Sequence, residues 1–212
     1  ERPSKKQKVA KMPSKEDDDE IDSPLIDVEM QSELMATPPE ERLKLIDELL
    51  DQKMDPSKDY QCDKYQLYLL KAITLDGLDK RTSSSFDTSL QALKEWERAL
   101  DFAVKNFPPL DENTIALRVQ VALCAHCLEK IMLDHGTLDS DRALEFHRIR
   151  PEIMAKHHAK EAMNMHDALF GGGKERFLKR YEKELLCPLR PISEAERRKI
   201  VHELFEQGPS KV

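Results

Sequence analysis

The residues best suited to chemistry in this chain are two cysteines, Cys124 and Cys127. On a helix, residues three apart share a face, so the two thiolates could supply half of a zinc site. The other two ligands would have to come from Cys62, Cys187 or one of the seven histidines, because no second pair has this spacing. A redox pair would sit at a helix N-terminus, whereas these cysteines fall within an apolar helical pattern. We therefore expect buried structural thiols rather than a zinc or redox centre.

The adjacent histidines His157 and His158 are the next candidates for metal binding. Adjacent helical residues point in different directions, so the two rings cannot easily reach one ion. His158 falls on the apolar stripe that includes Met154 and Ala162. We expect His158 to be a partly buried structural histidine.

Three glycines at Gly171–Gly173 precede Lys174 and resemble a fragment of a phosphate-binding loop. A Walker loop follows a strand and has Ser or Thr after its lysine. Here a helical pattern comes before the glycines and Glu175 follows the lysine. We predict a helix stop with a hinge at residues 171–173.

Catalytic patterns are missing from the sequence. It contains no HExxH, no serine in a glycine-rich elbow, and no carboxylate–histidine pattern with di-iron spacing. The sequence therefore favours a protein without enzymatic activity, bound cofactor or metal.

A basic surface is predicted near the C-terminus, where residues 174–199 contain nine Lys or Arg and five Glu. Its candidate partner-binding residues lie in one short helical segment and are Lys174, Arg176, Lys179, Arg180 and Lys183. With Phe177 and Tyr181 nearby, this surface could follow a phosphate backbone. It could equally be a solvated helix face with glutamate partners one turn away.

The sequence of the N-terminal segment predicts a localisation signal followed by a regulatory region. Lys5, Lys6 and Lys8 fit a short nuclear-import signal read by an import receptor. Ser14 precedes a run of acids and Ser23 precedes a proline, so both are candidate phosphorylation sites. The aliphatic run containing Leu25, Ile26 and Val28 resembles a SUMO-interacting motif, which would add a strand to a partner's sheet.

Composition sets the broad class. The chain has 212 residues, 39% hydrophobic and 35% charged, with a net charge of −7 that weighs against general nucleic-acid binding. Four scattered cysteines fit a reducing compartment better than a disulfide framework. No apolar run is long enough to span a bilayer, so we expect no membrane contact. The chain begins with Glu rather than Met, so we expect it to be a piece of a longer protein.

The elements that position these residues are predicted to be helices throughout. Residues 1–36 are rich in charge and lack aromatic side chains, which predicts a disordered tail. Thr37 and Glu40 form a capping-box pattern, so the helical domain is expected to span residues 37–212. Inside it, Leu93, Trp96, Leu100, Ala103 and Phe107 repeat at helical spacing.

Two fold classes remain open within the all-α class. Short predicted loops between seven or eight helices favour an irregular multi-helix bundle. The alternative is a short helical-hairpin repeat array, although a 34-residue unit does not repeat three times.

The functional expectation is a non-catalytic scaffold or adaptor. We expect protein partners in a nuclear chromatin, transcription or RNA-processing assembly, with partner helices or peptides held in apolar grooves. The alternative is a helical nucleic-acid-associated factor that uses the basic face at residues 174–199.

Overall fold

The computed structural model of the chain describes residues 28–51, 61–78, 85–135, 140–184, 195, 199 and 202–205. In these residues the helices are α1 (Val28–Ala36), α2 (Pro39–Asp51), α3 (Gln61–Gly77), α4 (Ser85–Asn106), α5 (Glu112–His135), α6 (Ser140–Ile149), α7 (Pro151–Phe170) and α8 (Gly173–Glu184). Residues 202–205 are helical as well, and no described residue is in a strand. The predicted all-α, multi-helix bundle is therefore confirmed.

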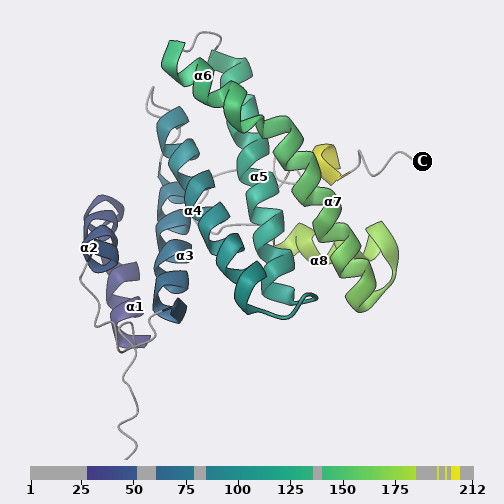
Figure 1. Cartoon of the computed structure of the whole chain (residues 1–212), viewed down its shortest axis with the longest axis horizontal. Helices are drawn as coiled ribbons and strands as arrows, with labels where there is room; N and C mark the ends of the chain where they lie inside the picture. The colour runs from purple at the N-terminus through teal and green to yellow at the C-terminus, as the bar shows by residue number, and fades with distance from the viewer. Residues whose placement is uncertain are drawn as a thin grey trace, which may run out of the picture.

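The helices pack mainly in the order in which they follow one another along the chain (Figure 1). The largest contacts join α3 to α4, α4 to α5, and α5 to α7, while α6 forms an elbow leading into α7. A helical-hairpin array would also stack its helices in sequence order. These four packed helices differ in length, with 17, 22, 24 and 20 residues, so they do not repeat one unit.

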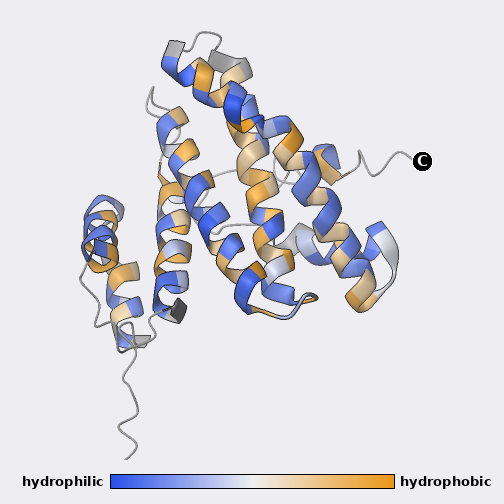
Figure 2. Ribbon diagram, in the orientation of Figure 1, coloured by the Kyte–Doolittle hydropathy of each residue, from blue (hydrophilic) through white to orange (hydrophobic). Residues whose placement is uncertain are grey.

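Helix α5 lies between α4 and α7 and contributes most to the core. Its side chains are buried on nearly every side, which explains why apolar colours run along much of its length in Figure 2. Leu117, Val121 and Leu128 are buried there, as are Trp96 and Leu100 of the helical repeat in α4. Phe107, the last residue of that repeat, is only half-buried at the end of α4.

The start of α5 is set by Asp111, an aspartate in the position just before the first helical residue. The carboxylate oxygen Oδ1 of Asp111 accepts hydrogen bonds from the backbone N–H groups of Asn113 (2.9 Å) and Thr114 (3.2 Å). These N–H groups have no partner inside the helix, so the cap satisfies two orphan donors and fixes the first turn.

The predicted start of the helical domain is wrong. Helix α1 occupies Val28–Ala36, within the segment that was expected to be disordered. Leu34 is buried, and Met30 packs beside the small second core formed by Ile46 and Leu67. Composition alone misplaced the boundary because α1 is held by contacts with α2 and α3, which its own sequence does not reveal.

The expected capping box at Thr37 is also not formed. The Thr37 hydroxyl donates a 2.8 Å hydrogen bond to the carbonyl of Glu33, so it ends α1. Helix α2 starts two residues later at Pro39, and the Pro38 carbonyl accepts from Arg42 N–H. Thr37 thus belongs to a tight turn between two helices rather than to the start of a domain.

Candidate functional site

The junction between α6 and α7, which we call the elbow, has an unusual backbone conformation at Arg150. Pro151 is the first residue of α7, and its ring disfavours a right-handed helical conformation at the residue before it. Arg150 adopts φ 51° and ψ 62°, in the left-handed region rather than the extended region usual before proline, and is the only described residue other than glycine with positive φ. Such strain is often found beside binding sites. The proline is therefore the first residue of a new helix and does not lie inside one long helix.

A groove opens on the inside of this elbow. It is lined by side chains of α5, α6 and α7, namely Glu129, Met132, Phe146, His147, Arg150, Pro151, Glu152 and Ile153, and has a volume of about 500 Å³. Ile153 stands at this groove with 58% of its surface exposed, although it belongs to a helix with a well-buried face. An exposed branched side chain beside half-buried Met132 and Phe146 forms an apolar surface within reach of a partner.

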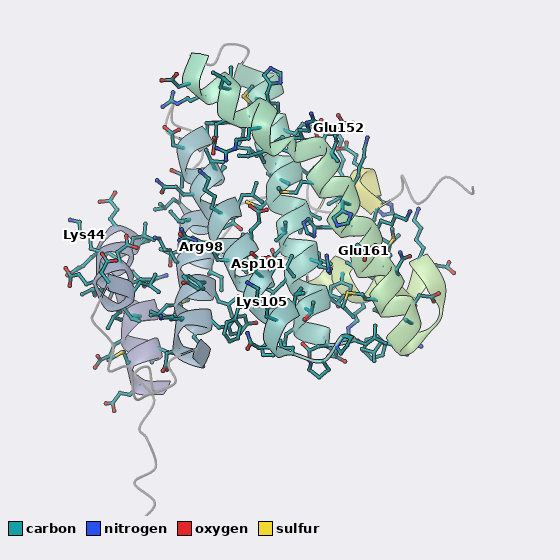
Figure 3. All side chains as sticks on the ribbon, viewed as in Figure 1. Lys44, Arg98, Asp101, Lys105, Glu152 and Glu161 are labelled. Atoms are coloured by element: carbon teal, nitrogen blue, oxygen red, sulfur yellow. The ribbon has the colours of Figure 1, made fainter. Side chains whose placement is uncertain are left out.

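Charges surround this apolar surface. Burial, and then repulsion from Glu152, raises the pKa of Glu129 above its ordinary value. Glu152, at the N-terminal end of α7 in Figure 3, accepts a 2.5 Å bond from Lys156. The hydrogen bond from Lys156, and then the positive charge of Lys156, lower the pKa of Glu152. The groove thus offers an apolar centre with a polar rim, which is the composition typical of protein interfaces.

Sequence reasoning missed this groove, although a signal for it was present. The apolar stripe of α7 runs through Met154, His158 and Ala162, and Ile153 lies off it. A large aliphatic residue outside the buried stripe, two positions after a proline, was the available signal. That Met132 and Phe146 line the same groove depends on how α5, α6 and α7 pack, and this required the structure.

The two cysteines of the candidate zinc site lie on α5, one buried and one half-buried. Cys124 is fully buried, and its Sγ lies 3.6 Å from the Ser89 carbonyl and 3.9 Å from Oδ1 of Asp76. Cys127 is half-buried, and neither thiol is part of a disulfide. Within the described residues no group of three His, Cys, Asp or Glu side chains is arranged to hold a metal ion. The side chain of Cys62 and the whole of Cys187 lie outside the described residues.

His158 is partly buried between α5 and α7, as predicted. Its Nδ1 lies 3.3 Å from Nη1 of Arg118, so the guanidinium donates and the imidazole accepts. Burial, followed by the positive charges of Arg118 and His157, lowers the pKa of His158 from 6.5 to about 4. His157 is exposed, and its ring lies beside that of His158, with the two ring centroids 5.0 Å apart. Within the described residues no third His, Cys, Asp or Glu side chain joins them in a group that could hold a metal ion.

This geometry predicts that acid destabilises the fold through His158. Its pKa is lower in the folded state, so its contribution is complete above about pH 6.5 and is lost as the pH falls towards 4. The full shift would correspond to about 3 kcal/mol, and partial solvent screening reduces the expected loss to about 1–2 kcal/mol. Urea unfolding at pH 7.5 and pH 5.0 should show a smaller pH difference for His158→Gln than for the native chain. An identical pH difference in both proteins would contradict this role.

The basic face predicted on α8 is only partly available to a ligand. Arg180 pairs with Glu112 of α5 at 2.8 Å and stacks over the Phe170 ring at 4.6 Å. Arg176 donates to the Phe170 carbonyl at 2.6 Å. These two arginines therefore fasten α8 to its neighbours. Lys174 and Lys179 are exposed, and the side chain of Lys183 lies outside the described residues.

The glycines at Gly171–Gly173 form a tight turn. All three have positive φ, and a Cβ on Gly172 would lie 2.8 Å from Cδ of Arg176. Asp167 accepts from both ends of the turn, through its carbonyl to Gly171 N–H and through Oδ1 to Gly173 N–H, each at 2.8 Å. The predicted helix stop is present, and the hinge stays a prediction.

The N-terminal candidates lie almost wholly outside the described residues. These are Lys5, Lys6, Lys8, Ser14, Ser23, Leu25 and Ile26. Val28 is the first residue of α1, so its backbone is helical and not in the extended form that strand addition requires.

Comparison with known proteins does not assign the chain to a family. The chain has no significant match among models of protein families, curated proteins or solved structures. None of the described helices combines the length and apolar character needed to cross a bilayer.

Proposed function

We propose that this chain is a non-catalytic docking module that binds an apolar segment of a partner protein in the elbow groove. The observation that carries the proposal is Ile153, 58% exposed beside Met132 and Phe146 in a groove of about 500 Å³. The chemistry-bearing side chains Cys124 and His158 support it too, since both are engaged in contacts within the fold.

The partner segment is a short helix or extended peptide with one or two large apolar side chains. Such a side chain would fill the groove between Phe146 and Ile153 and displace water from both. Polar groups of the segment would meet the polar rim formed by Glu152, Arg150 and His147. Affinity would depend on one apolar anchor rather than on net charge.

This docking is tested by comparing two exposed apolar positions. Ile153→Asp places a charge in the groove and should reduce partner capture at least tenfold, because burying an unpaired carboxylate is unfavourable. Val104→Asp is the matched control, since Val104 is 53% exposed on α4 and does not line the groove. In quantitative affinity purification from nuclear extract, proteins captured by the native chain should be lost with Ile153→Asp and retained with Val104→Asp. Equal recovery with both variants would contradict the proposal.

We further propose that the module works in the nucleus, within a larger chromatin, transcription or RNA-processing assembly. The support is the sequence of the N-terminal segment, where Lys5, Lys6 and Lys8 suit an import receptor. Changing all three to alanine should move a fluorescent fusion of the full chain from nucleus to cytoplasm. A nuclear signal unchanged by the three substitutions would remove this address.

A further inference from the structure

A second groove, independent of the elbow, lies between the two N-terminal helices. It is lined by residues of α1, α2 and the turn between them, namely Met30, Glu33, Leu34, Thr37, Leu45, Glu48 and Leu49, and its volume is about 320 Å³. We call it the α1–α2 groove. In Figure 1 these two helices stand at one edge of the molecule, beside α3 and far from α7.

The floor of the α1–α2 groove is aliphatic. Leu34 is buried, Met30 and Leu49 are half-buried, and Leu45 is 37% exposed. Ile46 and Leu67 support this floor from beneath as a small core of their own. The groove is therefore an apolar surface packed on buried side chains, and part of the Leu45 side chain remains exposed to water.

The rim of the groove is acidic. Helices α1 and α2 contain seven acidic residues, Glu29, Glu33, Glu40, Glu41, Asp47, Glu48 and Asp51, and two basic ones, Arg42 and Lys44. Arg42 is buried and bonded to backbone carbonyls, so its charge faces the interior. Lys71 of α3 pairs with Asp47 at 2.6 Å. Among the described residues, Glu33 and Glu48 have no ion-pair partner.

We propose that the α1–α2 groove binds a basic amphipathic helix of a partner protein. Apolar residues of that helix at positions i, i+3, i+4 and i+7 would contact Leu34, Leu45 and Leu49. Its flanking Lys or Arg side chains would pair with Glu33 and Glu48, which form no ion pair with a described residue. Charge complementarity decides the occupant, because an acidic segment or a nucleic acid would be repelled by the same rim.

The test uses the full chain and a defined probe. The probe is a labelled 18-residue amphipathic peptide with leucine at the helical positions above and lysine on its flanks, and the comparison peptide has glutamate in place of lysine. Fluorescence anisotropy should detect binding of the lysine peptide only. Glu33→Lys with Glu48→Lys should weaken that binding at least tenfold.

A matched double reversal controls for net charge. Asp101→Lys with Glu161→Lys changes the total charge equally, and Figure 3 shows these residues on α4 and α7, away from α1 and α2. This control should change affinity less than twofold. If the reversed pair at Glu33 and Glu48 fails to fold, Glu33→Gln with Glu48→Gln replaces it, with a loss of at least threefold expected.

Location and apolar contact are tested separately. Hydrogen exchange with bound peptide should show protection concentrated in α1 and α2. Leu45→Ser should weaken binding at 50 mM and 300 mM salt alike, because the contact it removes is apolar. Equal losses in both charge-reversed proteins, equal binding of the glutamate peptide, or protection confined to other helices would each overturn the proposal.

Discussion

Replacing Trp96 with alanine is expected to lower the free energy of unfolding by about 3–5 kcal/mol. Trp96 is 4% exposed in the interface of α4 with its neighbours, and Nε1 of its indole donates a 2.9 Å bond to Oδ2 of Asp76. Asp76 is itself 2% exposed at the end of α3. The substitution thus removes a large apolar side chain and a hydrogen bond to a buried carboxylate.

Two further variants separate these effects. Trp96→Phe keeps most of the ring but loses the N–H donor, and should cost about 2 kcal/mol. A double-mutant cycle of Trp96→Phe and Asp76→Ala should then give a coupling energy of about 1–2 kcal/mol. Urea denaturation measures all of these values. A loss below about 1 kcal/mol for Trp96→Ala would contradict burial of its side chain in the core. No coupling energy would mean that the hydrogen bond between Trp96 and Asp76 contributes nothing to stability.

Removal of the Arg42 side chain is expected to release α1 and α2 from the rest of the bundle, at a cost of about 2–4 kcal/mol. Arg42 is 6% exposed, and its Nη2 donates to the carbonyls of Met35 and Thr37, both at 2.8 Å. Its Nη1 reaches Oγ1 of Thr74 on α3 at 3.3 Å. The Arg42 side chain therefore provides hydrogen-bond donors to backbone carbonyls at the end of α1 and links that end to α3.

The measurement for Arg42→Ala is native-state hydrogen exchange. Amides of α1 and α2 should lose protection while those of α4 and α5 keep theirs, because the small core that joins these two helices to α3 is separate from the main core. Lys44→Ala on the same helix is the control, since Figure 3 shows Lys44 on the outer side of α2. It should change stability by less than about 0.5 kcal/mol. A uniform loss of protection in every helix would show that Arg42 supports the whole fold instead.

Much of the fold could be predicted from the sequence because its helices carry strong local signals. The spacing of Trp96 and Leu100 predicts α4, and Asp111 marks the start of α5. Helix α1 could not be predicted, because Leu34 and Met30 are stabilised by α2 and α3. Its composition resembles the charged segment before it.

The candidate site was less predictable because it depends on contacts between residues far apart in the sequence. Arg180 looks like a free cation in the sequence, but its partner Glu112 lies 68 residues away. The elbow groove needs Met132, Phe146 and Ile153 from three helices. Pro151 predicts that a helix begins or kinks, but not which surface the new helix direction leaves open.

Site-specific photocrosslinking in cells tests docking at the elbow most directly. A benzophenone amino acid would replace Ile153 in the groove or, as the control, Val104 on α4. We predict that position 153 forms a crosslink to a partner protein and that position 104 does not. Absence of a crosslink from position 153, or the same crosslinked protein from both positions, would contradict docking at the elbow groove.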